Sequence, residues 1–161
     1  MVVSDSSPLI CLAQLGDFHF LRDIFGHIVI PAAVHCEVVE QASGYDEVET
    51  AMDDWISVKQ IQGRSRAEQV RLAGRMDAGG AEAIVLTHEL KADRLLMDDQ
   101  RGVSFARELG LLVTRTPILY AEAKLRGWIP SVSEKLDALR KAGFWLKDRG
   151  YRVVLAKVGE L

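Results

Sequence analysis

The sequence predicts an α/β protein, a three-layer α/β/α sandwich with a mainly parallel central sheet. Short apolar runs of strand length alternate along the chain with longer stretches of helical periodicity. Gly, Pro, Ser and Asp residues separate the two kinds of segment. Some of the runs are apolar throughout, which is typical of strands that helices cover on both faces.

The predicted strands are the shortest apolar runs. The first, at 1–3, is β-branched and is broken by the Ser, Asp and Pro residues that follow it. The run Leu95, Leu96, Met97 reads as a strand buried on both faces. The remaining strands are expected at 27–30, 56–61 and 111–114.

The predicted helices lie between these strands and after the last of them. Ser7 is placed to cap the first helix, with Pro8 at its first position, and Gly26 stops the second. A polar link is expected at 41–45. In chain order, the helices are expected at 8–15, 17–25, 31–40, 46–55, 63–75, 81–90, 103–109, 116–125 and 131–141, with a last helix that ends at Lys157.

Composition predicts one globular domain that spans residues 1–161. The chain is 48% hydrophobic and 27% charged, and its 161 residues suffice for a sizeable core. The net charge of -3 gives no bulk attraction for nucleic acid, although local Lys and Arg patches can still bind phosphate. The N-terminus lacks a basic region followed by an apolar one, and no stretch is apolar enough to span a membrane, so we expect a cytoplasmic protein.

The two cysteines, Cys11 and Cys36, fall in apolar surroundings without a CxxC spacing. This pattern predicts buried free thiols in a reducing compartment. His35 beside Cys36 invites a metal site, but chain neighbours on a helix point to different sides. A packed cysteine and a surface histidine are therefore expected there.

Four carboxylates stand where a parallel sheet would gather them. Asp5 and either Asp98 or Asp99 follow predicted strands. Glu37 and Glu82 lie in helices that leave strand ends. The carboxyl edge of an open parallel sheet is where ligands bind, so these side chains can converge on one rim. Side-chain alternation favours Asp98 over Asp99 as the member that faces the site.

These acids can also have purely structural roles. Asp5 can satisfy backbone groups of a turn, and Glu82 can cap a helix. The acidic segment 46–55 is most simply a solvated face. Glu37, however, falls near the buried side of its helix, where a carboxylate needs a cation or several donors. Converging carboxylates would repel one another unless a cation such as Mg²⁺ or Mn²⁺ shared the site, and such an ion suits phosphodiester hydrolysis.

Five segments together carry a resemblance to a known family: VVSDSSPLICLAQLG, IPAAVHCEVVE, GGAEAIVLTHELKADRLLMDD, AEAKLRGWIP and LAKVGEL. In their order and spacing they resemble the PIN domain nucleases, which include the VapC-type toxins of toxin-antitoxin pairs. The likeness is to a PIN-like branch that is catalogued as a domain of unknown function, and it covers nearly the whole chain.

The resemblance implies a PIN-like fold and a set of functional residues. The catalytic acids it implies are Asp5, Glu37, Glu82 and Asp98, with Asp99 as a further metal ligand. Ser6 resembles the hydroxyl beside the first acid, and Ser6, Arg101 and Lys124 are the expected contacts to substrate.

Three departures from the pattern of this branch bear on substrate binding and activity. Gly80 stands where relatives often carry the Glu of a G-E-A-E run. Val103 and Ser104 follow Arg101 where relatives tend to have a basic residue, and Arg115 replaces a common glycine. The four implied acids are all present.

Three functions are compatible with these residues. The first is an endoribonuclease that uses Mg²⁺ or Mn²⁺ and acts on RNA as the toxin of a toxin-antitoxin pair. The second is a PIN-like module that binds nucleic acid or protein without cutting. The third is a receiver-like phosphoacceptor or phosphatase. It ranks last because Asp5 is followed by Ser6 and Ser7 and not by a second acid.

The first function implies protein partners but no membrane. An antitoxin could block the acidic rim with an Arg, because a guanidinium matches a carboxylate well. The apolar helix around Leu119 and Leu125 could serve a homodimer, although a core role explains these residues equally.

Overall fold

The computed structural model describes residues 1–41 and 44–161. Five short strands alternate with helices within these residues, as the sequence predicts. The strands are β1 (Val2–Ser4), β2 (Ile28–Pro31), β3 (Ile56–Lys59), β4 (Arg94–Leu96) and β5 (Val113–Thr114). The helices are α1 (Ser6–Gln14), α2 (His19–Phe25), α3 (Ala32–Gln41), α4 (Tyr45–Ala51), α5 (Arg64–Gly74), α6 (Ala78–Glu89), α7 (Gln100–Glu108), α8 (Thr116–Leu125), α9 (Val132–Lys141) and α10 (Asp148–Lys157).

The strands form one sheet in the order β3-β2-β1-β4-β5, and each pair of neighbours is parallel. The central strand β1 pairs with both β2 and β4, with Val3 opposite Val29 on one side and Leu95 on the other. The chain moves outward from β1 to β2 and β3, then crosses back to β4 and β5. Ligands bind in open sheets where the strand order reverses in this way. That place is the carboxyl end of β1.

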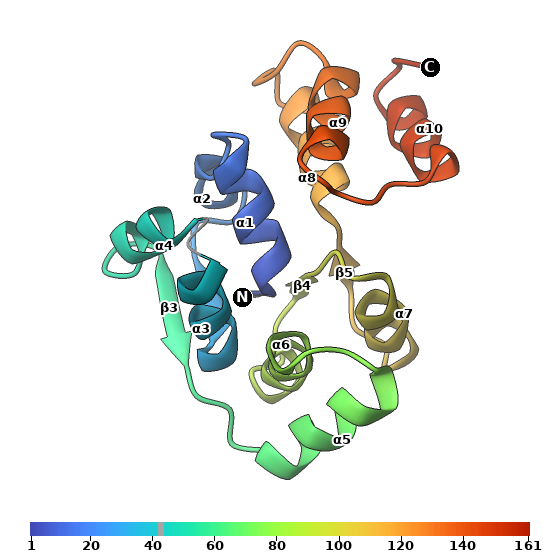
Figure 1. Ribbon diagram of the computed structural model, residues 1–161. Helices are drawn as coiled ribbons and strands as arrows, with labels where there is room; N and C mark the ends of the chain where they lie inside the picture. Colours follow the sequence, from blue (N-terminus) through green and yellow to red (C-terminus); the bar gives the residue numbers. More distant parts are fainter. Residues whose placement is uncertain (42–43) are drawn as a thin grey trace.

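Successive strand residues are buried in two separate cores, one on each face of the sheet. Val2 and Ile30 pack with side chains of α1, α2, α3 and α8, while Val3 and Leu95 pack with those of α5, α6 and α7. Figure 1 shows α5, α6 and α7 grouped on one side, away from α1 and α2. The fold is therefore the expected three-layer α/β/α sandwich with a parallel central sheet.

Several details differ from the sequence-based expectations. Helix α1 begins at Ser6, one residue before the predicted capping residue Ser7, because the Asp5 carboxylate accepts the Ser6 N–H. The last strand is shorter than predicted and begins at Val113. Residues 42 and 43 of the polar link predicted at 41–45 lie outside the described residues. None of the described helices has the length and apolar character needed to cross a membrane.

The prediction of two buried thiols is wrong for Cys36, which is exposed, whereas Cys11 is half-buried. Cys36 lies on the side of α3 that is turned away from its buried residues Val34 and Val38. The neighbouring His35 is half-buried, with Nε2 2.6 Å from Oε1 of Glu49.

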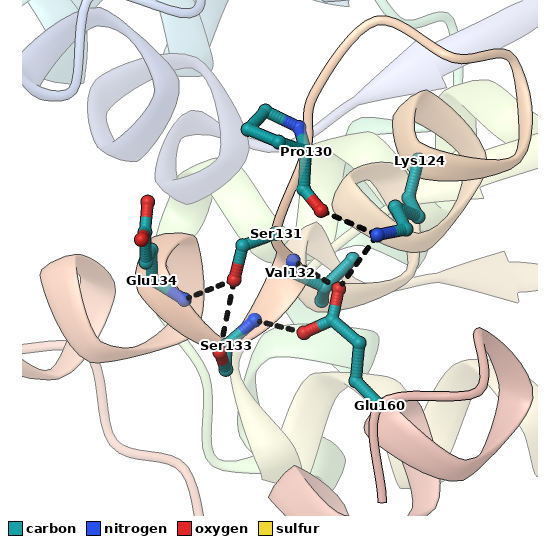
Figure 2. Close-up of polar contacts among 7 residues, drawn as sticks. All are labelled: Lys124, Pro130, Ser131, Val132, Ser133, Glu134 and Glu160. Carbon is teal, nitrogen blue, oxygen red and sulfur yellow. Dashed lines mark hydrogen bonds and ion pairs between the residues drawn. The ribbon is translucent and has the colours of Figure 1, made fainter.

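Glu160 fastens the end of the chain to the start of α9 (Figure 2). Its carboxylate accepts the N–H groups of Val132 at 2.7 Å and Ser133 at 2.9 Å, and Lys124 Nζ lies 3.3 Å from Oε1. Burial raises the pKa of Glu160, but the two N–H donors and Lys124 lower it more, and the net pKa lies below the ordinary 4.5. A charged carboxylate at a helix N-terminus is stabilising.

We expect Glu160→Gln to lower the free energy of unfolding by about 1 kcal/mol at neutral pH, because the charge-assisted hydrogen bonds are lost. A lowered pKa means that this contribution is present above pH 4.5 and is lost as the pH falls through the folded-state pKa. Urea unfolding at about pH 7 and about pH 3 measures the difference, which should shrink in acid.

Glu134→Gln is the matched control, since Glu134 is exposed in the first turn of the same helix. Equal losses in the two variants would show that the contacts of Glu160 add nothing beyond its charge.

Candidate metal centre

Asp5, Glu37 and Asp77 come together at the carboxyl edge of the sheet. One carboxylate oxygen from each lies within 4.8 Å of the others, and no other such group of three acidic, His or Cys side chains occurs in the described part of the chain. Asp5 is buried, Glu37 is half-buried and Asp77 is exposed, so the cluster leads from the interior to the surface. It opens on a hollow of about 380 Å³, lined also by Ser6 and Ser7, which we call the acidic hollow.

Asp5 is held between the central strand and the first helix. Its N–H donates to the carbonyl of Leu96 at 2.9 Å, which extends the pairing of β1 and β4 by one residue. Its Oδ1 accepts the Ser6 N–H at 2.8 Å and so caps α1. The side chain cannot leave the sheet edge without breaking the helix cap.

Glu37 reaches the cluster from the second turn of α3. Oε2 accepts the Ser6 hydroxyl at 2.8 Å, and Oε1 accepts the N–H of Gly79 at 2.9 Å. A Cβ on Gly79 would lie 2.4 Å from both carboxylate oxygens. Glycine at this position leaves the space that the Glu37 carboxylate occupies, and any side chain there would displace that carboxylate.

Asp77 caps α6, with Oδ1 accepting the N–H of Gly80 at 2.8 Å. Asp77 is not among the residues that the sequence assigned to the site. The helix was predicted to begin at Ala81, whereas α6 begins at Ala78, and an Asp directly before a helix start is a strong N-cap candidate. An acid at that position must lie at the same sheet edge as the helix start.

Asp98 and Asp99 occupy different environments. Asp98 is buried, and its two oxygens accept the Thr116 N–H at 2.7 Å and the Thr116 hydroxyl at 2.6 Å. Asp99 is exposed and caps α7 by accepting the N–H of Gly102 at 2.7 Å. Asp98 lies close enough to Asp5 to raise its pKa. Of the two neighbours, Asp98 is thus the one that faces inward.

Asp98 and Asp99 are not members of the group of three, and three further residues of the predicted set also lie apart from it. Glu82 is not a member of the group of three, and its Oε2 accepts the N–H of Ala33 at 3.1 Å, at the start of α3. Arg101 is exposed in a separate hollow together with Arg75. Lys124 contacts Glu160 and donates to the carbonyl of Pro130.

A family model described as a PIN domain matches residues 1–160. The chain belongs to the PIN domain family. No curated protein matches it. PIN domains are generally nucleases, which are hydrolases, and they typically use divalent metal ions.

Burial and mutual repulsion raise the pKa values of the acids in this PIN domain. The pKa of Asp5 is raised to about 8, first by burial and then by the charges of Asp77, Glu37 and Asp98. Burial, together with Asp77, raises the pKa of Glu37. Burial also raises the pKa of Asp98, although the Thr116 hydrogen bonds and Arg115 oppose the shift.

The donor set of this PIN domain fits a hard divalent cation. Carboxylate oxygens are the ligands that Mg²⁺ and Mn²⁺ prefer, and a bound cation offsets the repulsion that raises the pKa of Asp5. Among the hydrogen bonds of the described residues, Oδ2 of Asp5 and Oδ2 of Asp77 accept none, so each has a free oxygen for an ion. Glu37 is held in place by Ser6 and Gly79.

We expect Gly79→Ala to weaken Mn²⁺ binding about tenfold or more, because the added methyl group displaces Glu37 from the cluster. Calorimetric titration with Mn²⁺ measures the change, with circular dichroism to check the fold. Gly150→Ala, in α10, is the control. Its Cβ would meet Cδ1 of Leu146 at 3.1 Å and no residue of the cluster. Wild-type affinity in both variants would contradict the role given to Glu37.

We expect Asp5→Asn to stabilise the metal-free protein at neutral pH by about 1 to 3 kcal/mol, while Asn keeps the helix cap. The folded state binds the Asp5 proton more tightly than the unfolded chain, so stability falls as the pH rises from 3.8 to about 8. The gain from Asn should therefore vanish near pH 4. Thermal unfolding in EDTA at about pH 4 and about pH 7.5 tests this, and identical curves for the two proteins at both pH values would contradict it.

Proposed function

We propose that this PIN domain is a metal-dependent endoribonuclease. The observation that carries the proposal is the convergence of Asp5, Glu37 and Asp77 within 4.8 Å at the carboxyl edge of the sheet. Asp98, buried beside Asp5, completes a set of four acids in this proposal. RNA is the proposed substrate because the sequence resembles the VapC-type ribonucleases.

In this proposal Asp5, Glu37, Asp77 and Asp98 hold Mg²⁺ or Mn²⁺. When bound, the ion supplies positive charge that activates a water and stabilises the leaving oxygen of the phosphodiester. Asp5 gives up its proton to let the ion bind, since its pKa of about 8 leaves it largely protonated at neutral pH in the metal-free protein. Ser6 orients Glu37, and Thr116 orients Asp98.

The roles of the remaining predicted residues follow from their positions. Ser6 and Arg101 remain proposed substrate contacts, with Arg101 next to Asp99 in the hollow that also contains Arg75. Lys124 could contact substrate only after exchanging its bond to Glu160. Glu82 and Asp99 cap helices, and the assay of Glu82→Gln described below tests whether Glu82 also binds the metal.

The proposal extends to a toxin-antitoxin pair. A cognate antitoxin would inhibit by placing an Arg against the carboxylates of the acidic hollow, because a guanidinium offers paired donors to carboxylates. A homodimer would use the exposed end of α8, where Leu125 is 69% exposed, whereas Leu119 is part of the core.

The direct test is the cleavage of single-stranded RNA by the purified protein. We expect cleavage with Mg²⁺ or Mn²⁺, none in EDTA, and a loss of about a hundredfold or more in Asp5→Asn, which retains the helix cap but not the charge. Asp53→Asn, in the exposed segment after α4, is the control and should cleave normally. RNA binding without cleavage under every metal condition would favour the non-catalytic module instead.

The same assay separates two candidate acids. Asp77→Asn should reduce both cleavage and Mn²⁺ affinity about tenfold or more, because Asp77 belongs to the cluster. Glu82→Gln should mainly reduce stability through the start of α3. The reverse result would return Glu82 to the metal site.

A further inference from the structure

We infer that a second hollow, beside the acidic one, binds a nucleoside of a single-stranded RNA, with Trp145 stacking on the base and Arg115 contacting a phosphate. This inference rests on the proposed function, because it names how the substrate strand of that site is held. The hollow has a volume of about 460 Å³, and its lining includes Cys11, Asp98, Arg115, Phe144 and Trp145. We call it the aromatic hollow.

The aromatic hollow borders the acidic hollow. It shares Ser7, Ile10 and Cys11 of α1 with the acidic hollow, and Asp98 lines it. The connection between α9 and α10, which carries Phe144 and Trp145, passes beside the start of α8 (Figure 1). A strand whose phosphate lies at the acids would therefore extend along α1 into this hollow.

Trp145 supplies a surface suited to a base. The indole is 63% exposed, and within the described residues it pairs with no other aromatic ring. Lys147 Nζ lies over one face of the ring, 5.2 Å from the centroid, so a base would stack on the opposite face with this positive charge nearby. Base-aromatic stacking tolerates any sequence, since every base has a π-face, and nearby cations favour the attached phosphates.

Arg115 supplies the charge that the hollow needs for a phosphate. Its guanidinium lies over the Phe144 ring, 5.7 Å from the centroid, and Nη2 donates to the carbonyl of Asp98 at 3.2 Å. Nε is buried and has no hydrogen-bond partner within residues 1–41 and 44–161. Nη1 makes no hydrogen bond within those residues either, and it is the donor left for a phosphate. A guanidinium held in place with donors to spare is suited to phosphate, which accepts two parallel hydrogen bonds.

The occupant follows from the charges and the shape. Two acids line the hollow, Asp98 and Asp99, and their carboxylates accept hydrogen bonds from Thr116 and Gly102. The cationic groups that can meet an anion are Arg115 in the lining and Lys147 over the Trp145 ring. A base can reach Trp145 only when it is not stacked in a duplex. A single strand is therefore the expected ligand.

The test measures binding without cleavage, using the protein of residues 1–161 in EDTA and a fluorescein-labelled single-stranded RNA of about eight nucleotides. One abasic residue is moved along the RNA, and anisotropy gives each dissociation constant. We expect one position at which loss of the base weakens binding about tenfold. Trp145→Leu should weaken binding of the intact RNA by the same factor and add nothing when that base is missing.

Trp128→Leu is the matched control, because Trp128 is also exposed and also carries a cation, Arg126, 5.1 Å from its ring, but it does not line the aromatic hollow. It should bind RNA as the wild type does. The inference would be overturned if Trp145→Leu bound RNA as the wild type does, or if its loss added to that of the abasic residue. It would also be overturned by an equal loss in Trp128→Leu, or if the wild type did not bind RNA at all. If the coupling is found but the wild type with Mn²⁺ leaves the RNA intact, the nucleoside site stands and the nuclease proposal fails.

Discussion

Acidic side chains bound to helix N-termini are the interaction on which the functional edge of this protein depends. Parallel strands send each following helix away from the same edge of the sheet, so the partial positive charges of the helix starts gather there. Each of these starts receives a carboxylate: α1 from Asp5, α3 from Glu82, α6 from Asp77 and Glu37, α7 from Asp99, and α8 from Asp98. The fold can thus concentrate acids at one edge because the backbone supplies donors for them.

The helix-cap hydrogen bonds do not neutralise the negative charge of the cluster. This remaining charge favours a metal-binding role over a purely structural one. Asp5 receives a backbone hydrogen bond that lowers its pKa, yet burial and three neighbouring acids raise that pKa to about 8. A structural cap has no need of such neighbours, since one carboxylate satisfies a helix start. The excess negative charge costs stability in the metal-free protein, as is common at sites shaped by function.

The sequence predicted the fold, and it named Asp5 and Glu37, two of the three acids that the structure brings together, because strand ends and helix caps are local signals. Asp5 and Asp98 follow strands, and the alternation of strand residues separates Asp98 from Asp99. The sequence did not show in the same way that Asp77, and not Glu82, belongs to the cluster. Helix α6 is buried on nearly all sides, so its sequence has no single apolar stripe that fixes its rotation. Cys36 was misplaced for a related reason, since the rotation of α3 is set by packing against α6 and α1.

The role inferred for Arg115 from the structure differs from the one inferred from the sequence. As a replacement for a glycine common in related sequences it raised doubt about substrate binding, whereas its position beside Asp98 and Phe144 gives it an anion-binding role. A chain of net charge -3 does not attract nucleic acid at long range. Affinity for RNA must then come from short-range contacts, and stacking on an indole is one that salt does not screen. The exposed Trp145 next to a held guanidinium meets that requirement, which is why substrate binding and metal binding can occupy adjacent hollows along the same helix.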